Sequence, residues 1–231
     1  MPDYPKAGTI LLAGASRGLG LGLAETFLSR GWTVIATART PEKSPGLAAL
    51  HAAHGSRLRI ETLDVTDPAS ATALAATLNG VTLDVLFVVA GVLTHQNTPV
   101  QDLPAADVAE TFVTNATAPV ALAEILLPHV KHAGTVAFMT SILGSIGLNS
   151  GGYDLYRASK AALNMLASCF ALRHTAHPVL LLHPGWVRTE MGGPGAAIDV
   201  ETSVTGLADV IMREHRAGID YLDYTGKHLA W

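Results

Sequence analysis

Two side chains in the segment YRASK, Tyr156 and Lys160, have the types and the spacing of an acid–base pair. Residues four apart on a helix lie on one face, one turn from each other. A phenol has a pKa of about 10, too high for ready proton exchange at neutral pH, and a nearby ammonium lowers it by stabilising the phenolate. The pair could serve as a general acid or base, although a Tyr packed on a Lys stem shows the same spacing.

Two further polar residues precede this pair in positions that suit chemistry. Ser141 ends the apolar run TVAFMTS, where its hydroxyl could hold a substrate carbonyl oxygen or cap a turn. Asn115 lies within a long helical pattern, followed by Thr117 and Pro119, and all three residue types are unfavourable inside a helix. A local conflict of this kind often marks a functional site.

The elements that must position these residues alternate along the chain. Near-continuous apolar runs, typical of strands covered on both faces, occur at 9–14, 33–38, 58–64, 83–91, 135–141 and 178–185. Helical spacing separates them, at 18–30, 68–79, 104–131, 153–173 and 200–214. This alternation predicts an α/β fold: one Rossmann-like domain over 1–231, a doubly wound parallel sheet with helices on both faces.

A cluster of glycines lies where the first predicted strand meets the first predicted helix. The pattern is Gly14-x-x-x-Gly18-x-Gly20, with Ser16, Arg17 and Leu19 between the glycines. Glycines here let the backbone approach a pyrophosphate, and the helix N-terminus offers N–H groups and a positive dipole end. The alternative is that they only let helix and strand pack closely.

In the order glycine-rich turn, Asn115, Ser141, Tyr156, Lys160, the chain resembles the short-chain dehydrogenase/reductase family over nearly its whole length. The resemblance implies that Tyr156 donates a proton in carbonyl reduction and that Lys160 lowers its pKa and hydrogen-bonds the nicotinamide ribose. It also implies that Ser141 orients the carbonyl and that Asn115 holds a water that relays protons to Lys160.

Three further segments extend the resemblance to the cofactor. Asp64 and Val65 in LDVTD fall where the family contacts the adenine ring. In VVAG, only Ala90 and Gly91 match the family's Asn-Asn-Ala-Gly, since two valines replace the asparagines. The segment PGWVRT resembles the turn that meets the nicotinamide carboxamide, which implicates three further residues: Pro184, Val187 and Thr189.

The second predicted strand indicates which nicotinamide cofactor fits. Sheets that prefer NAD place an acid at its end, and here that position falls at Ala38, followed by Arg39. Arg39 and Arg17 supply two guanidiniums and no carboxylate, which favours a 2′-phosphate and therefore NADP(H). The alternative is that both are ordinary surface charges. Because NADPH usually drives reductions, we predict reduction of a ketone or aldehyde, in the manner of the C-factor and Sniffer-like carbonyl reductases that the chain resembles.

Composition limits the partners and the location. Charged residues make up 15% of the 231 and the net charge is −4, so no basic field invites nucleic acid. No apolar run approaches the roughly 18 residues of a membrane span, and no signal peptide is evident, so a cytoplasmic protein is expected. The low fraction of charged residues suggests that part of the surface is hidden in an oligomer. The small residues near Ala161 lie on the predicted helix that resembles the one joining subunits in this family, so we predict a homodimer or homotetramer. The one cysteine, Cys169, is expected to be a buried structural thiol.

The substrate is predicted only as a class. Segments 93–97, 142–153 and 185–199 should form its pocket, with 185–199 as a lid, and their apolar residues suggest an apolar or aromatic carbonyl compound. The ten histidines give no convincing metal site, and His183 is expected to be a packed strand residue. Two alternatives stay open: a dinucleotide-binding regulatory or signalling protein with little turnover, and an NADP-dependent alcohol dehydrogenase working oxidatively.

Overall fold

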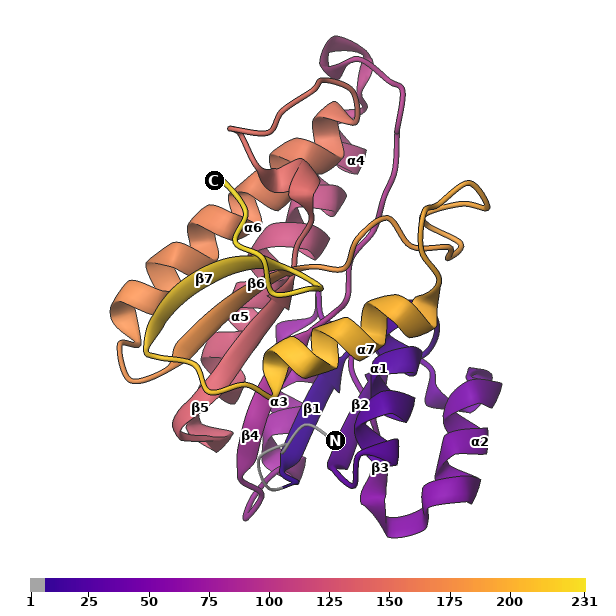
Figure 1. Ribbon diagram of the computed structural model, residues 1–231. Coiled ribbons are helices and arrows are strands. Elements are labelled where there is room, and N and C mark those ends of the chain that lie inside the picture. The colour runs from indigo at the N-terminus through magenta and orange to yellow at the C-terminus, as the bar shows by residue number, and fades with distance from the viewer. Residues whose placement is uncertain (1–6) are drawn as a thin grey trace.

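The computed structural model describes residues 7–231, and these form one parallel sheet of seven strands in the order β3-β2-β1-β4-β5-β6-β7 (Figure 1). The strands are β1 (Thr9–Ala13), β2 (Thr33–Ala38), β3 (Leu58–Thr62), β4 (Leu83–Val88), β5 (Val130–Met139), β6 (Pro178–His183) and β7 (Gly218–Asp223). The order reverses between β1 and β4, which is where a doubly wound sheet binds ligands beyond its carboxyl ends. The predicted fold class is confirmed.

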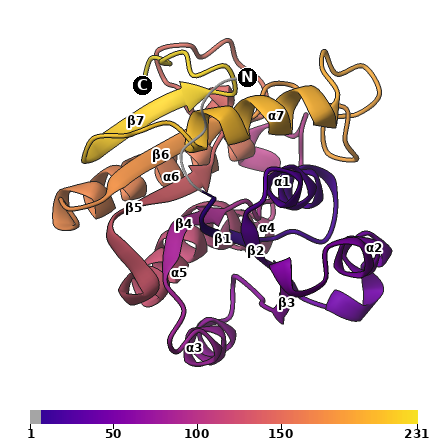
Figure 2. The same ribbon diagram turned by 60° about the horizontal axis from the view of Figure 1, so that its bottom comes forward.

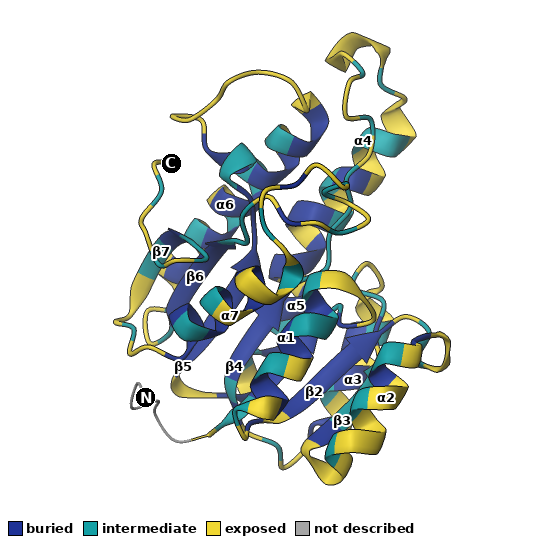
Figure 3. Cartoon of the chain, turned by 45° about the vertical axis from the view of Figure 1, so that its right-hand side comes forward, coloured by how far each residue is buried: buried dark blue, intermediate teal, exposed yellow. Residues whose placement is uncertain are grey.

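Helices cover both faces of this sheet (Figure 2). They are α1 (Gly18–Ser29), α2 (Pro45–His54), α3 (Pro68–Thr77), α4 (Ala105–Phe112), α5 (Ala118–Leu126), α6 (Asp154–Arg173) and α7 (Val200–Ile211). One apolar core joins the sheet to α1, α2 and α7, and the other joins it to α3, α5 and α6. The inner strands are therefore buried between two helical layers, whereas the edge strands β3 and β7 are only partly buried (Figure 3).

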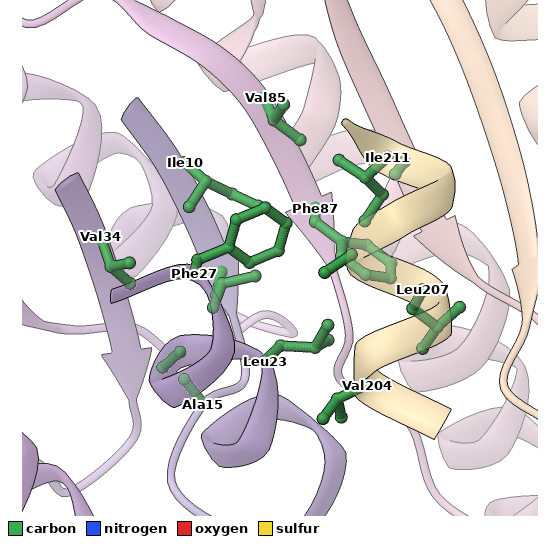
Figure 4. Packing of buried hydrophobic residues seen from close by; sticks show 14 of the residues in the cluster. Ile10, Ala15, Leu23, Phe27, Val34, Val85, Phe87, Val204, Leu207 and Ile211 are labelled. Atoms are coloured by element: carbon green, nitrogen blue, oxygen red, sulfur yellow. The ribbon is translucent and has the colours of Figure 1, made fainter. Parts of the chain in front are cut away.

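The packing of α1 and α7 on the sheet illustrates how the first core holds the glycine-rich end of β1 in place. Phe27 of α1 and Leu207 of α7 are fully buried beside Phe87 of β4 (Figure 4). Complete burial of such a side chain stabilises the fold by about 1.5–3 kcal/mol. Gly22 lets the two helices meet, since a Cβ there would lie 2.9 Å from a methyl of Val200.

The predicted helix 104–131 is interrupted in the structure. Between α4 and α5, residues Val113–Thr117 form a π-helical turn, and β5 already begins at Val130. Pro119, four residues after Asn115, has no N–H for an α-helical bond to the Asn115 carbonyl, so an α-helix could not continue unchanged through this turn. The local conflict in the sequence thus has a structural counterpart.

Other differences from the sequence-based expectations concern single elements. The helix α2 and the strand β7 were not predicted, because their periodicity is weak and β7 mixes polar with apolar residues. The prediction for Cys169 is wrong: its side chain is exposed on α6, since it lies on the helix face that points away from the sheet.

The continuous helical stretch Ala105–His129 is long and apolar enough to cross a membrane by length and composition alone. Half of its most apolar window is buried inside the protein. Ala116 and Ala123 are fully buried in the core that this stretch shares with α3 and α6. That packing is what a core helix of a globular domain shows.

Candidate active site

The four predicted catalytic residues come from three elements that meet beyond the carboxyl ends of β4 and β5. Ser141 lies two residues beyond the end of β5, and Asn115 lies in the π-helical turn. Tyr156 and Lys160 lie on one face of α6. All four are buried, with exposed fractions from 0% for Asn115 to 9% for Tyr156. Buried polar side chains need hydrogen-bond partners, so their contacts define the site.

The Asn115 side chain fastens the π-helical turn to the loop after β4. Its Oδ1 accepts a hydrogen bond from the Val92 N–H, and its Nδ2 donates to the Val92 carbonyl, both at 2.8 Å. Nδ2 also donates to Ser159 Oγ, which in turn donates to the Tyr156 carbonyl at 2.8 Å. Both hydrogens of the amide nitrogen are therefore used in positioning the turn.

The Lys160 ammonium is enclosed by backbone. Its Nζ donates to the Met139 carbonyl at 3.0 Å, and a Cβ on Gly91 would lie 3.3 Å from it. Gly144 packs closely against the backbone of Lys160, because a Cβ at Gly144 would lie 2.9 Å from the Lys160 carbonyl carbon. Burial lowers the pKa of Lys160 to about 8, since a charge is costly away from water.

Tyr156 differs from the expectation in the direction of its pKa. Burial raises the pKa of Tyr156 to about 12, and a hydrogen bond with the Ser141 hydroxyl opposes that rise. Lys160 is not among the groups that lower this pKa, and its Nζ lies 5.7 Å from the Tyr156 ring centroid. The phenol is therefore protonated at neutral pH, the form that a proton donor requires.

The glycine-rich turn brings β1 against the loop after β4. Gly14 has φ +100°, and a Cβ there would lie 3.0 Å from Ala90, whose N–H donates to the Ala13 carbonyl. Gly20 is the tightest position, since a Cβ would lie 2.0 Å from the Gly14 carbonyl oxygen. Both glycines are required by the protein's own packing, so the close-packing interpretation holds for them.

A dinucleotide fits the same turn. Gly18 has φ +54° and lies at the exposed N-terminus of α1, beside Leu19, and no side chain caps that terminus. The first N–H groups of the helix therefore have no side-chain acceptor, which suits a pyrophosphate. Ser16 is exposed at the turn, and its carbonyl accepts a hydrogen bond from the Ser44 hydroxyl at 2.7 Å.

The charges near the second strand agree with the choice of NADP(H). Ala38 is the last residue of β2, as predicted, and the exposed Arg39 follows it. Hydrogen bonds from Thr66 lower the pKa of Asp64, and the Arg39 charge adds to this effect. Asp64 thus lies within electrostatic reach of Arg39. Val65, next to it, packs against the second core.

Arg17 has a partner that the sequence did not predict. It forms an ion pair with Glu190, and both side chains are largely exposed. The segment 185–199 therefore contacts the glycine-rich turn. It is also braced internally, by a bridge between Val187 and Ile198 and by a bond from the Trp186 ring nitrogen to the Gly192 carbonyl at 2.9 Å.

The remaining predicted cofactor residues lie just before this segment and in its first part. The Pro184 carbonyl accepts a hydrogen bond from Ser203 of α7 at 2.7 Å, and Val187 is buried. Thr189 Oγ1 accepts from the Gly192 N–H, and its methyl would lie 3.9 Å from a Cβ on Gly18. The turn after β6 thus lies beside the turn after β1. The order of these segments in the sequence does not predict that contact.

His183 ends β6 with its Nδ1 buried and unpartnered, and burial lowers its pKa to about 4. Within residues 7–231, no group of three or more His, Cys, Asp or Glu side chains could hold a metal ion. Sequence reasoning missed Ser159, although its place inside YRASK made it visible. It also missed Tyr221, Asn164 and Thr140, whose contacts depend on the tertiary fold.

Comparison with known proteins agrees with this geometry. The family model for short chain dehydrogenases matches residues 8–197, and the chain belongs to that family. The C-signal of Myxococcus xanthus is 39% identical over 137 residues, which cover 56% of this chain and 82% of that protein. The predicted family resemblance is confirmed.

Two solved structures extend the likeness over almost the full length. A Burkholderia multivorans chain of the short-chain dehydrogenase/reductase type, solved with bound NADP, has 44% identity and a TM-score of 0.94, covering 98% of this chain and 100% of its own. The carbonyl reductase Sniffer of D. melanogaster has 30% identity and a TM-score of 0.91, with the same coverage.

Proposed function

We propose that this oxidoreductase reduces a ketone or an aldehyde to an alcohol with NADPH. The observation that carries the proposal is the buried group Ser141, Tyr156 and Lys160, assembled beside a glycine-rich turn that fits a pyrophosphate. Bound NADPH supplies the hydride. The NADP-bound Burkholderia structure and the Sniffer carbonyl reductase support the cofactor and the reaction class.

The protein's own residues handle the proton and the substrate's orientation. The Ser141 hydroxyl holds the carbonyl oxygen, and the Tyr156 phenol gives that oxygen its proton as the C–O double bond becomes a single bond. Lys160 then restores the proton to the phenolate, since burial favours the neutral forms of both the amine and the phenol. Asn115, in its π-helical turn, connects Lys160 to solvent through a held water.

The substrate is an apolar or aromatic carbonyl compound. Large apolar side chains remain exposed on the two loops beyond the catalytic residues, including Ile146, Leu148, Trp186 and Met191. Trp186 and Met191 belong to 185–199, the proposed lid, and they would be covered by a substrate of matching character.

The test follows NADPH oxidation by absorbance with a panel of ketones, aldehydes and quinones, in wild type and Tyr156→Phe. Loss of a general acid costs about 10²–10⁴ in rate, so Tyr156→Phe should lose at least a hundredfold in kcat. NADPH affinity, measured by fluorescence titration, should stay within a few-fold. Turnover that survives the substitution would overturn the assignment of Tyr156.

A second function is favoured by one relative. The C-signal of Myxococcus xanthus carries a name that points to signalling, which keeps a dinucleotide-binding signalling protein in view. Tight NADPH binding without turnover on the whole panel would favour it. Turnover that runs faster from alcohol and NADP⁺ than from carbonyl and NADPH would instead favour the oxidative dehydrogenase.

We also propose a cytoplasmic homo-oligomer. Met165 and Leu172 of α6 are 65% and 77% exposed, and Cys169 lies between them on the same face. Residues spaced by four and three form one stripe on a helix, and an apolar stripe in water favours association. Sedimentation velocity measures the assembly directly.

A further inference from the structure

The peptide that carries Ser141 is held from a strand two places away in the sheet. Tyr221 belongs to β7, which pairs with β6, which pairs with β5. Its side chain is 1% exposed, and its hydroxyl donates to the Ser141 carbonyl at 2.5 Å. A buried phenol needs a polar partner, and this one uses the backbone of the residue proposed to hold the substrate oxygen.

The same turn is held a second time from α6. Thr140 Oγ1 donates to Asn164 Oδ1 at 2.7 Å, and Asn164 Nδ2 donates to the Gly144 carbonyl at 3.4 Å. The Gly144 N–H donates to the Ser141 carbonyl at 2.8 Å, so that oxygen accepts from both Gly144 and Tyr221. With Thr140 1% and Asn164 4% exposed, water cannot replace these bonds.

The bonds around Ser141 also fix its hydroxyl. Ser141 Oγ accepts from the Leu143 N–H at 3.2 Å, which directs the hydroxyl proton away from the turn. A rotation of the Ser141 peptide would move Oγ, and a misplacement of about 1 Å in a catalytic group can lower a rate about a hundredfold. The chain segment beyond β7 adds support, since the Trp231 carbonyl accepts from the Gly147 N–H and the Trp231 ring lies 5.5 Å from that of Tyr221.

We infer that Tyr221 is a positioning residue, which acts through the Ser141 carbonyl to hold the Ser141 hydroxyl where the substrate oxygen binds. This inference rests on the proposed function, in which Ser141 orients the carbonyl. The Tyr221 hydroxyl is used by the Ser141 carbonyl, so in this inference it acts through the backbone and not on the substrate. Its contribution therefore depends on the Ser141 hydroxyl being present.

A double-mutant cycle between Tyr221→Phe and Ser141→Ala tests this dependence, with 4-nitrobenzaldehyde as the carbonyl probe at saturating NADPH. The alanine variant keeps the backbone carbonyl and loses only the hydroxyl. Tyr221→Phe should lower kcat about tenfold in the wild type and less than twofold in Ser141→Ala, with NADPH affinity unchanged in both. Tyr224→Phe, three residues along the chain, is the matched control and should leave kcat unchanged, because Tyr224 is only partly buried and packs against the first core.

Each remaining outcome is decisive. An equal fall in kcat with and without the Ser141 hydroxyl would show a general structural role for Tyr221 and overturn the inference. Wild-type kcat in Tyr221→Phe would also overturn it. Wild-type kcat in Ser141→Ala would instead overturn the proposed role of Ser141 itself. Should Tyr221→Phe not fold, Thr140→Val breaks the second support of the same turn, and the same non-additivity with Ser141→Ala is expected.

Discussion

The two halves of the sheet's carboxyl edge are built by different means. Beside β1 and β2, the candidate cofactor residues are glycines and exposed charges, of which Arg17 and Arg39 are examples. Beyond β5 and on α6, the candidate catalytic residues are buried side chains, none more than 9% exposed. The first half offers a cofactor its backbone N–H groups and charges that solvent screens. The second half holds a few buried side chains in fixed positions.

This difference predicts how substitutions in each half should affect cofactor binding and stability. Exposed charges are screened by water and salt, so single substitutions there have graded effects. Backbone that is packed against backbone cannot yield, and a buried ionisable group cannot be rehydrated without cost. Three substitutions test this contrast, and they are given in order of decreasing expected effect.

Gly20→Ala should have the largest effect. The new Cβ would lie 2.0 Å from the Gly14 carbonyl oxygen and 2.9 Å from the Ala15 Cα, so the turn itself must move. We expect NADPH affinity to fall at least about a hundredfold and the free energy of unfolding to fall by about 1–3 kcal/mol, as for other overpacked sites. Fluorescence titration and urea unfolding measure the two. Gly195→Ala is the control, since its nearest neighbour is the Trp186 ring at 3.9 Å. NADPH binding by Gly20→Ala at the wild-type level would contradict the expectation.

His183 should make stability depend on pH in the acidic range. Burial lowers its pKa from 6.5 to about 4, and Asp223 only partly opposes this. Above pH 6.5 the ring is neutral in both folded and unfolded chains. Between 6.5 and 4 the unfolded chain binds the proton and the folded chain does not, so stability falls as the pH falls.

A pKa change of this size corresponds to about 3 kcal/mol of unfolding free energy across that window. His183→Gln should lack this part of the loss, whereas His51→Gln, at an exposed position of α2, should keep it. Urea unfolding at several pH values measures the difference. Parallel curves for wild type and His183→Gln would show that the buried ring does not titrate as expected.

Arg39→Ala should have the smallest effect, and a selective one. A charge-assisted bond to a 2′-phosphate is lost, which should weaken NADPH binding about tenfold and leave NADH binding unchanged. The effect should shrink at high salt because the side chain is exposed. Equal affinities of the wild type for NADPH and NADH would remove the basis of the prediction. Arg59→Ala, in an ion pair with Glu61 on β3, is the matched control.

Much of the fold and the site was predictable because the signals are local. The apolar runs gave six of the strands, and the glycine spacing gave the turn before α1. β7 was missed because Asp220 and Asp223 interrupt its short apolar run, and with it the proposed role of Tyr221, which depends on a contact 80 residues away in the sequence. The burial of Cys169 was predicted wrongly because helical periodicity does not say which face a neighbouring layer covers.

The pattern of residues alone established the family, the order of the first six strands and the candidacy of Asn115, Ser141, Tyr156 and Lys160 for catalysis, since spacing along a helix or at a strand end is a local property. Only the tertiary structure decided their electrostatics. Burial raises the pKa of Tyr156 and lowers that of Lys160, and both shifts come from layers that are distant in the chain. Desolvation depends on what surrounds a group in space, and no pattern of neighbours along the sequence contains that information.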